Sequence, residues 1–99
     1  MKLKEMLSDY QLGEQQKWDG EQIITGITDS SRDITEGMVF VAITGFEQDG
    51  HDYIPHAIAQ GAALIVGEHD YPEALPIPYL QVANSRQVLG QLADKFYQH

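Results

Sequence analysis

Two short, uninterrupted runs of apolar residues constrain the fold of this chain more than any other feature. Residues 38–43 read MVFVAI between Gly37 and Gly45, and residues 63–66 read ALIV. A strand with one face in water alternates apolar and polar residues, whereas these two runs do not alternate. Such runs are typical of strands that are buried on both faces, and these strands occur in parallel sheets covered by helices.

The neighbouring elements are predicted from weaker patterns. Residues 23–28 alternate and are rich in β-branched side chains, so they are predicted as a strand, and YLQV at residues 79–82 is predicted as another. Asp52 is predicted to cap a helix that has Pro55 in its first turn and ends near Gly61. These elements place a helix between the second and third strands.

Two further helices complete the prediction. Residues 2–7 form a short amphipathic helix, and Asn84 or Ser85 caps the last helix. The apolar face of the last helix comprises Val88, Leu89, Leu92, Ala93 and Phe96. The order strand, strand, helix, strand, strand, helix predicts an α/β fold, a small three-layer domain with a mostly parallel sheet and flanking helices. We expect one domain, 1–99, with residues 1–22 partly loop.

Composition and charge exclude several classes of protein. The chain has no cysteine, so it has neither disulfides nor thiolate metal sites. Its formal net charge is −9, and Arg32 and Arg86 are the only permanent cations between Lys17 and Lys95, so nucleic-acid binding is not expected. The N-terminus lacks the apolar segment of a signal peptide, and no apolar run approaches the roughly 20 residues of a membrane span. We therefore expect a cytoplasmic, soluble protein.

The predicted ligand-binding edge lies beyond the carboxyl ends of the strands, where ligands bind in open parallel sheets. Four segments follow predicted strands, namely residues 29–32, 45–51, 67–70 and 83–86. The first offers hydroxyls, a carboxylate and an arginine, and the second offers glycines, an aromatic ring and an amide. Both also have a structural interpretation, the first as a turn that satisfies its own backbone and the second as an ordinary loop.

No catalytic residue and no metal site is predicted from the residue pattern. The four histidines are scattered, and His51 and His56 are five positions apart, which does not suit a pair of metal ligands on one helix face. Residues 68–70 (EHD) contain acid–base groups but read as a solvated loop. No glycine is followed by lysine, so the phosphate-binding GxxxxGK[ST] loop is absent.

The central part of the sequence resembles the N-terminal domain of the Mur ligases, and within that family most resembles the MurE branch. The similar features are Thr28 to Arg32, Gly37 before Phe40-Val41-Ala42, then Gly45, Asp49-Gly50-His51, Tyr53-Ile54 and Gly61-Ala62. A Phe-Tyr pair near the end of the last helix is also similar to MurE. The resemblance covers residues 23–99.

The resemblance implies a site for the UDP moiety of UDP-N-acetylmuramoyl-L-alanyl-D-glutamate. The residues that it assigns to this UDP-substrate site are Ser31, Asp29, Phe46, Glu47 and Gln48. One position departs from the family pattern, because Ser30 stands where members usually have aspartate before the matching serine.

The resemblance also implies what this chain lacks. Mur ligases continue into an ATPase domain and a C-terminal domain, so ATP and Mg²⁺ are expected for the full-length enzyme and no cofactor for this fragment. The chain alone is expected to be inactive, although its parent would be an ATP-dependent acid–amino-acid ligase. Three alternatives stay open: the N-terminal domain of the related MurF ligase, a non-catalytic interaction domain that keeps the fold without the ligand, and a small stand-alone hydrolase.

Overall fold

The computed structural model describes residues 1–12, 16–45, 48–70 and 75–98. Its centre is one four-stranded sheet in the order β1-β2-β3-β4, and every neighbouring pair is parallel. The strands are β1 (Gly26–Thr28), β2 (Met38–Val41), β3 (Leu64–Gly67) and β4 (Tyr79–Gln81). The predicted α/β fold with a parallel sheet is confirmed.

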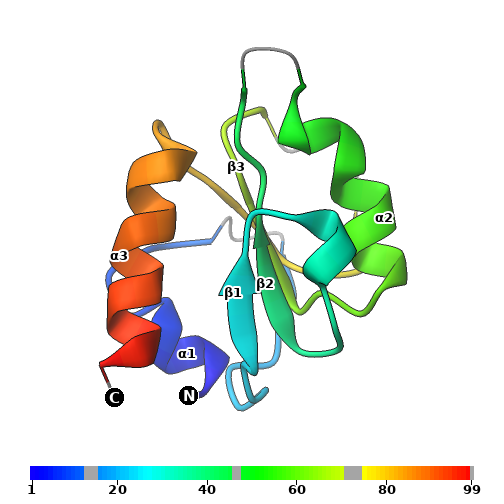
Figure 1. The fold of residues 1–99 in the computed structure, drawn as a ribbon. Helices are drawn as coiled ribbons and strands as arrows, with labels where there is room; N and C mark the ends of the chain where they lie inside the picture. Colours follow the sequence, from blue (N-terminus) through cyan, green and yellow to red (C-terminus); the bar gives the residue numbers. More distant parts are fainter. Residues whose placement is uncertain (13–15, 46–47, 71–74, 99) are drawn as a thin grey trace.

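Helices cover both faces of the sheet (Figure 1). The bounds are α1 (Leu3–Met6), η1 (Ser31–Asp33), η2 (Gly50–Tyr53), α2 (Ile54–Ala59) and α3 (Ser85–Tyr97), where η marks a 3₁₀ turn. In Figure 1, α1 and α3 lie on one side of the strands and α2 lies on the other. The molecule therefore has the predicted three layers.

The central strands are buried on both faces, as their unbroken apolar sequences predict. In β2, Val39 and Val41 join the core beneath α1 and α3, while Phe40 joins the core beneath α2. In β3, Leu64 and Val66 face the first core and Ile65 faces the second. Since successive side chains of a strand point to opposite faces, two apolar layers require an unbroken apolar run.

The last helix begins as predicted. Asn84 is its N-cap, and the Asn84 side chain accepts a hydrogen bond from the backbone N–H of Gln87 at 3.0 Å. Val88 and Leu92 of α3 are buried against the sheet. Cap and apolar face act together to place the start of α3 beside the carboxyl end of the sheet.

The predicted cap of the middle helix is wrong. Asp49, not Asp52, caps the turn, and its carboxylate accepts from the backbone N–H of His51 at 2.9 Å. The chain enters α2 through the 3₁₀ turn η2 (Gly50–Tyr53). Asp52 lies inside this turn and therefore does not cap it. Gly61 does follow the end of α2, with a φ of +102° that favours glycine.

No helix within the described residues is long and apolar enough to cross a membrane.

Candidate functional site

A pocket of about 1020 Å³ opens beyond the carboxyl ends of β1 and β2. Its lining residues come from β2, from the two segments after β1 and β2, and from the start of the following helix: Asp29, Ser30, Ser31, Arg32, Phe40, Ile43, Gly45, Gln48, Gly50, Tyr53 and His56. Asp29, Ser31 and Gln48, three of the five predicted site residues, therefore line one pocket. Phe46 and Glu47, the other two, lie outside the described residues.

The turn after β1 presents the polar side chains of the pocket. The Thr28 hydroxyl accepts from the backbone N–H of Ser30 at 3.1 Å, and the chain then enters η1 at Ser31. Ser31 is buried, and no hydrogen bond joins its hydroxyl to another residue that the structure describes. Its donor and acceptor capacity is therefore available to the pocket, whereas Thr28 is used by its own turn.

The segment after β2 closes on itself to form a second wall. The backbone N–H of Gly45 donates to the carbonyl of Gln48 at 2.8 Å, and the N–H of Gly50 donates to the carbonyl of Ile43 at 2.9 Å. A Cβ at Gly50 would lie 2.7 Å from the backbone nitrogen of Ile43, so no side chain fits there. This tight closure leaves the Gln48 side chain exposed at the pocket.

The pocket lining includes further residues that were not among the predicted site residues, notably Tyr53, His56 and Arg32. Tyr53 is 40% exposed and His56 is also exposed. Both lie at the start of the helical segment that follows the pocket loop, which is the segment between β2 and η2. The spacing of three residues between them was the available signal, because residues three apart share one face of a helix. Arg32 forms no ion pair with any described residue, so its guanidinium is available to an anion.

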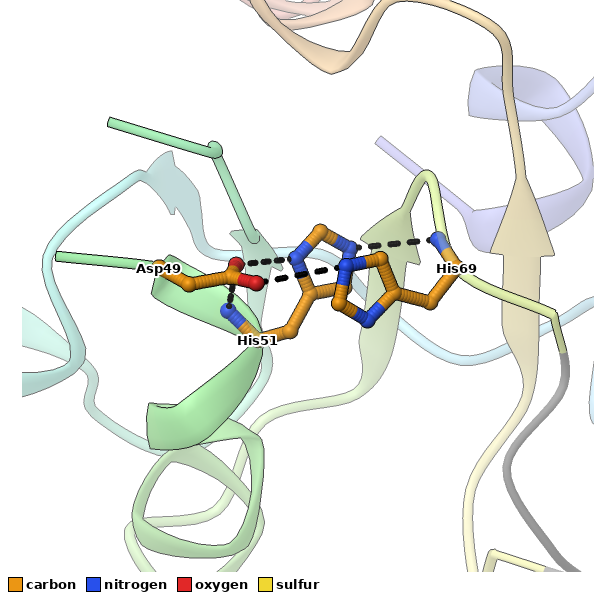
Figure 2. Close-up of side chains that lie close together, drawn as sticks. All are labelled: Asp49, His51 and His69. Atoms are coloured by element: carbon orange, nitrogen blue, oxygen red, sulfur yellow. Dashed lines mark hydrogen bonds and ion pairs between the residues drawn. The ribbon is translucent and has the colours of Figure 1, made fainter. Parts of the chain in front are cut away.

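A second polar cluster adjoins the pocket loop and is drawn in Figure 2. The Asp49 carboxylate contacts two imidazoles: its Oδ1 lies 2.5 Å from Nδ1 of His51, and its Oδ2 lies 3.2 Å from Nε2 of His69. The two rings stack with centroids 3.6 Å apart and an interplanar angle of 5°. Hydrogen bonding from the His51 backbone N–H is the main reason that the pKa of Asp49 lies below its ordinary value.

Asp49, His51 and His69 offer ligand atoms within 4.8 Å of one another, but their geometry does not suit a metal ion. An ion bound to an imidazole lies in the plane of the ring, about 2.0–2.1 Å from the nitrogen for zinc. Because the two rings are nearly parallel and 3.6 Å apart, their lone pairs run side by side and do not converge on one point. Asp49 is therefore the hydrogen-bonding partner of both rings.

The cluster continues from β3 to the start of α3. Glu68 Oε2 accepts from the backbone N–H of Ser85 at 2.7 Å and from the Ser85 hydroxyl at 3.0 Å. These bonds, the backbone one first, lower the pKa of Glu68. His69 and Asp70 are exposed, as expected for a solvated loop, but Glu68 is half-buried and ties β3 to α3.

The hydroxyl of Tyr79 completes this region by donating to the carbonyl of His69 at 2.7 Å. Burial raises the pKa of Tyr79 to about 12, so the phenol is protonated and serves as a donor.

Comparisons with known proteins place the chain in one family. A family model described as "Mur ligase family, catalytic domain" matches residues 23–97. A UDP-N-acetylmuramyl-tripeptide synthetase of Roseiflexus sp. is 46% identical over 77 residues, which are 77% of this chain and 15% of that protein. A UDP-N-acetylmuramoyl-L-alanyl-D-glutamate–2,6-diaminopimelate ligase of Bacteroides fragilis is 41% identical over 101 residues, covering 98% of this chain and 20% of that protein. The chain therefore spans about a fifth or less of these relatives.

Solved structures give the same result for the fold. MurF from Acinetobacter baumannii superposes with a TM-score of 0.72 at 25% identity, over 98% of this chain and 21% of that one. MurF ligase from Thermotoga maritima, solved in complex with ADP, superposes with a TM-score of 0.59 at 31% identity, over 72% of this chain and 16% of that one. The family model matches residues 23–97, which are most of this chain, so this chain belongs to the Mur ligase family.

Proposed function

We propose that the pocket beyond β1 and β2 binds the UDP moiety of UDP-N-acetylmuramoyl-L-alanyl-D-glutamate. The observation that carries the proposal is that Ser31, Asp29 and Gln48, assigned by family resemblance, line one pocket although they come from two separate segments. The names of the MurE relatives support the substrate, since they describe ligases that act on this UDP-linked dipeptide.

The chemistry of the pocket suits a nucleoside diphosphate. The Asp29 carboxylate and the Gln48 amide offer acceptors and a donor to the edge of a uracil or to ribose hydroxyls. Arg32 offers paired N–H donors to a phosphate, and the buried Ser31 hydroxyl adds one more. A volume of about 1020 Å³ is at the upper end of the roughly 300–1,000 Å³ of ligand pockets, and Tyr53 supplies an aromatic surface.

We propose that the whole protein catalyses ATP-dependent amide formation in peptidoglycan precursor synthesis in the cytoplasm. The residues of this chain would form its substrate-binding domain. The present residues do not fit ATP and Mg²⁺, because the sequence has no phosphate-binding loop with lysine. This chain alone is therefore expected to bind substrate without catalysing ligation.

Calorimetric titration of the chain with UDP tests the proposal. Ser31→Ala should weaken UDP binding about tenfold, since one buried hydrogen bond to a charged group is lost. The matched control is Ser8→Ala, because Ser8 bonds to Lys95 on the α1–α3 side and does not line the pocket. Absence of heat with UDP and with the UDP-linked dipeptide would contradict the proposal and favour the alternative of a non-catalytic interaction domain.

The MurF branch remains the second candidate, because two solved structures with the same fold, those from Acinetobacter baumannii and Thermotoga maritima, are MurF ligases. Both branches carry UDP on their proposed substrate, so titration with UDP alone does not distinguish them. Comparison of the UDP-linked dipeptide with the UDP-linked tripeptide does: tighter binding of the dipeptide favours the MurE branch, and tighter binding of the tripeptide favours the MurF branch.

A further inference from the structure

Both ring nitrogens of the buried His51 have hydrogen-bond partners. Nε2 lies 2.8 Å from the backbone nitrogen of Glu68 and 3.3 Å from that of His69. A backbone N–H only donates, so Nε2 must accept and carries no proton. The proton of the neutral ring therefore sits on Nδ1, which donates to Oδ1 of Asp49 at 2.5 Å (Figure 2).

This ring joins the pocket loop to the end of β3. Asp49 closes the loop that carries Gln48 and pairs with Thr44 across it. On the other side of the ring, Glu68 begins the segment after β3 and accepts from Ser85 at the start of α3. A continuous chain of hydrogen bonds thus runs from the pocket loop through His51 to α3.

The sequence around the ring leaves space for it. A Cβ at Gly67 would lie 2.8 Å from Nε2 of His51, so any side chain there would displace the imidazole. His51 itself is only 9% exposed, and all its polar atoms are paired within the described residues. The space and the partners fit one ring in one tautomer.

We propose that His51 is the positioning residue of the nucleotide pocket: in its neutral, Nδ1-protonated form it holds residues 48–50 in place, and its protonation releases them. This inference rests on the proposed function. A second proton would sit on Nε2 and point at the two backbone N–H groups of Glu68 and His69, so the ring would have to leave its place. UDP affinity should then fall as the pH is lowered.

The charged groups that face His51 have opposite effects on the protonation of its ring. The carboxylates of Asp49 and Glu68 favour a protonated ring, whereas the stacked His69 disfavours it when it is itself charged. The neutral Tyr79 hydroxyl packs beside the ring over Gly67 and adds no charge. A direct contact between a pocket histidine and UDP predicts the opposite pH dependence, because a protonated His56 would strengthen the binding of an anion.

The first experiment records nitrogen spectra of the chain with ¹⁵N-labelled histidine, with no nucleotide present. The expected result at neutral pH is a His51 ring with protonated Nδ1 and unprotonated Nε2, assigned by its loss in His51→Gln. A ring protonated on Nε2, or a charged ring at neutral pH, overturns the proposal. On lowering the pH, the amide signals of Gln48 and Gly50 should shift together with the His51 ring.

The second experiment measures UDP binding between pH 5 and 8 in matched variants. The His51→Asn amide keeps a donor near Asp49 but offers no acceptor to Glu68, while the His51→Gln amide reaches the Nε2 position but loses the donor to Asp49. Each should weaken UDP binding about tenfold, the cost of leaving one buried partner unpaired, and should abolish the loss of affinity at low pH. His56→Asn should retain that loss.

The outcomes separate the inference from the proposed function. If the wild-type chain binds UDP and both His51 variants bind equally well with the same pH profile, the positioning role is wrong and the proposed function stands. If the wild-type chain binds no UDP at any pH, the proposed function fails, while the nitrogen spectra still decide whether the neutral ring holds the loop. If both variants unfold, the coupled shift of Gln48 and Gly50 in the wild-type chain decides.

Discussion

At the scale of single residues, Gly67 shows how an absent side chain determines the arrangement around the site. Gly67 is the last residue of β3, and a Cβ there would meet both the Tyr79 hydroxyl and Nε2 of His51. Both groups are hydrogen-bonded, since the Tyr79 hydroxyl donates to the carbonyl of His69 and Nε2 of His51 accepts from the backbone N–H of Glu68. Neither group can move without breaking a buried hydrogen bond.

Gly67→Ala should therefore lower the free energy of unfolding by about 2 kcal/mol, within the range for overpacking a core. The matched control is Gly90→Ala, because nothing lies within 4 Å of a Cβ at Gly90, inside α3. Alanine in a helix interior should raise stability by about 0.5–1 kcal/mol. Urea denaturation of the two variants measures both effects, and equal stability of Gly67→Ala and the wild type would contradict the packing argument.

At the scale of elements, Glu68 links the end of β3 to the first turn of α3. Its carboxylate accepts two hydrogen bonds from Ser85, and its pKa is lowered for that reason. A group whose folded pKa is lowered stabilises the fold above its unfolded pKa of about 4.3, and this contribution disappears as the pH falls through the folded value.

Glu68→Gln should accordingly reduce stability at neutral pH and reduce the loss of stability on acidification. Urea denaturation at a series of pH values between 7 and 2 measures this difference between variant and wild type. Glu36→Gln, which alters an exposed carboxyl group, is the control. A Glu68→Gln profile parallel to that of the wild type over the whole range would mean that the carboxylate does not link the two elements.

The elements themselves could largely be predicted from sequence, because strands and long helices depend on local patterns. The unbroken runs at residues 38–43 and 63–66 predicted β2 and β3. The cap of the middle helix was misassigned because the sequence DGHD places carboxylates at both Asp49 and Asp52, and only the 3₁₀ turn that precedes α2 decides between them.

Contacts between distant residues could not be predicted. The Gln16 amide pairs with both the N–H and the carbonyl of Tyr79, 63 positions away on the edge strand. The cluster of Asp49, His51 and His69 likewise joins two loops that share only a sheet edge. A parallel sheet brings strand ends together, but which side chains meet there depends on loop closure, which has no periodic signal. The assignment of Asp29, Ser31, Gln48, Phe46 and Glu47 to a UDP site stays a prediction, and only the first three lie within the described residues.

At the scale of the whole molecule, the chain has the compactness of an independent domain. Its radius of gyration is 12.1 Å, close to the roughly 13 Å of a folded domain of about 100 residues. It also has an apolar core on each face of the sheet. Cooperative unfolding of this chain by itself is therefore expected, which allows ligand binding to be measured as a gain in stability.

UDP should raise the melting temperature of the chain, whereas ATP should do so less, because the pocket offers one arginine for phosphate and the sequence lacks a phosphate-binding loop. At free UDP of ten times the dissociation constant, linkage gives about 1.4 kcal/mol of stabilisation, or roughly 6–10 °C for a domain of this size. Differential scanning calorimetry with matched magnesium-free nucleotide concentrations measures both shifts. A larger shift with ATP than with UDP would mean that the pocket recognises the length of the phosphate chain and not uridine, and it would remove the basis for assigning the UDP-linked dipeptide as substrate.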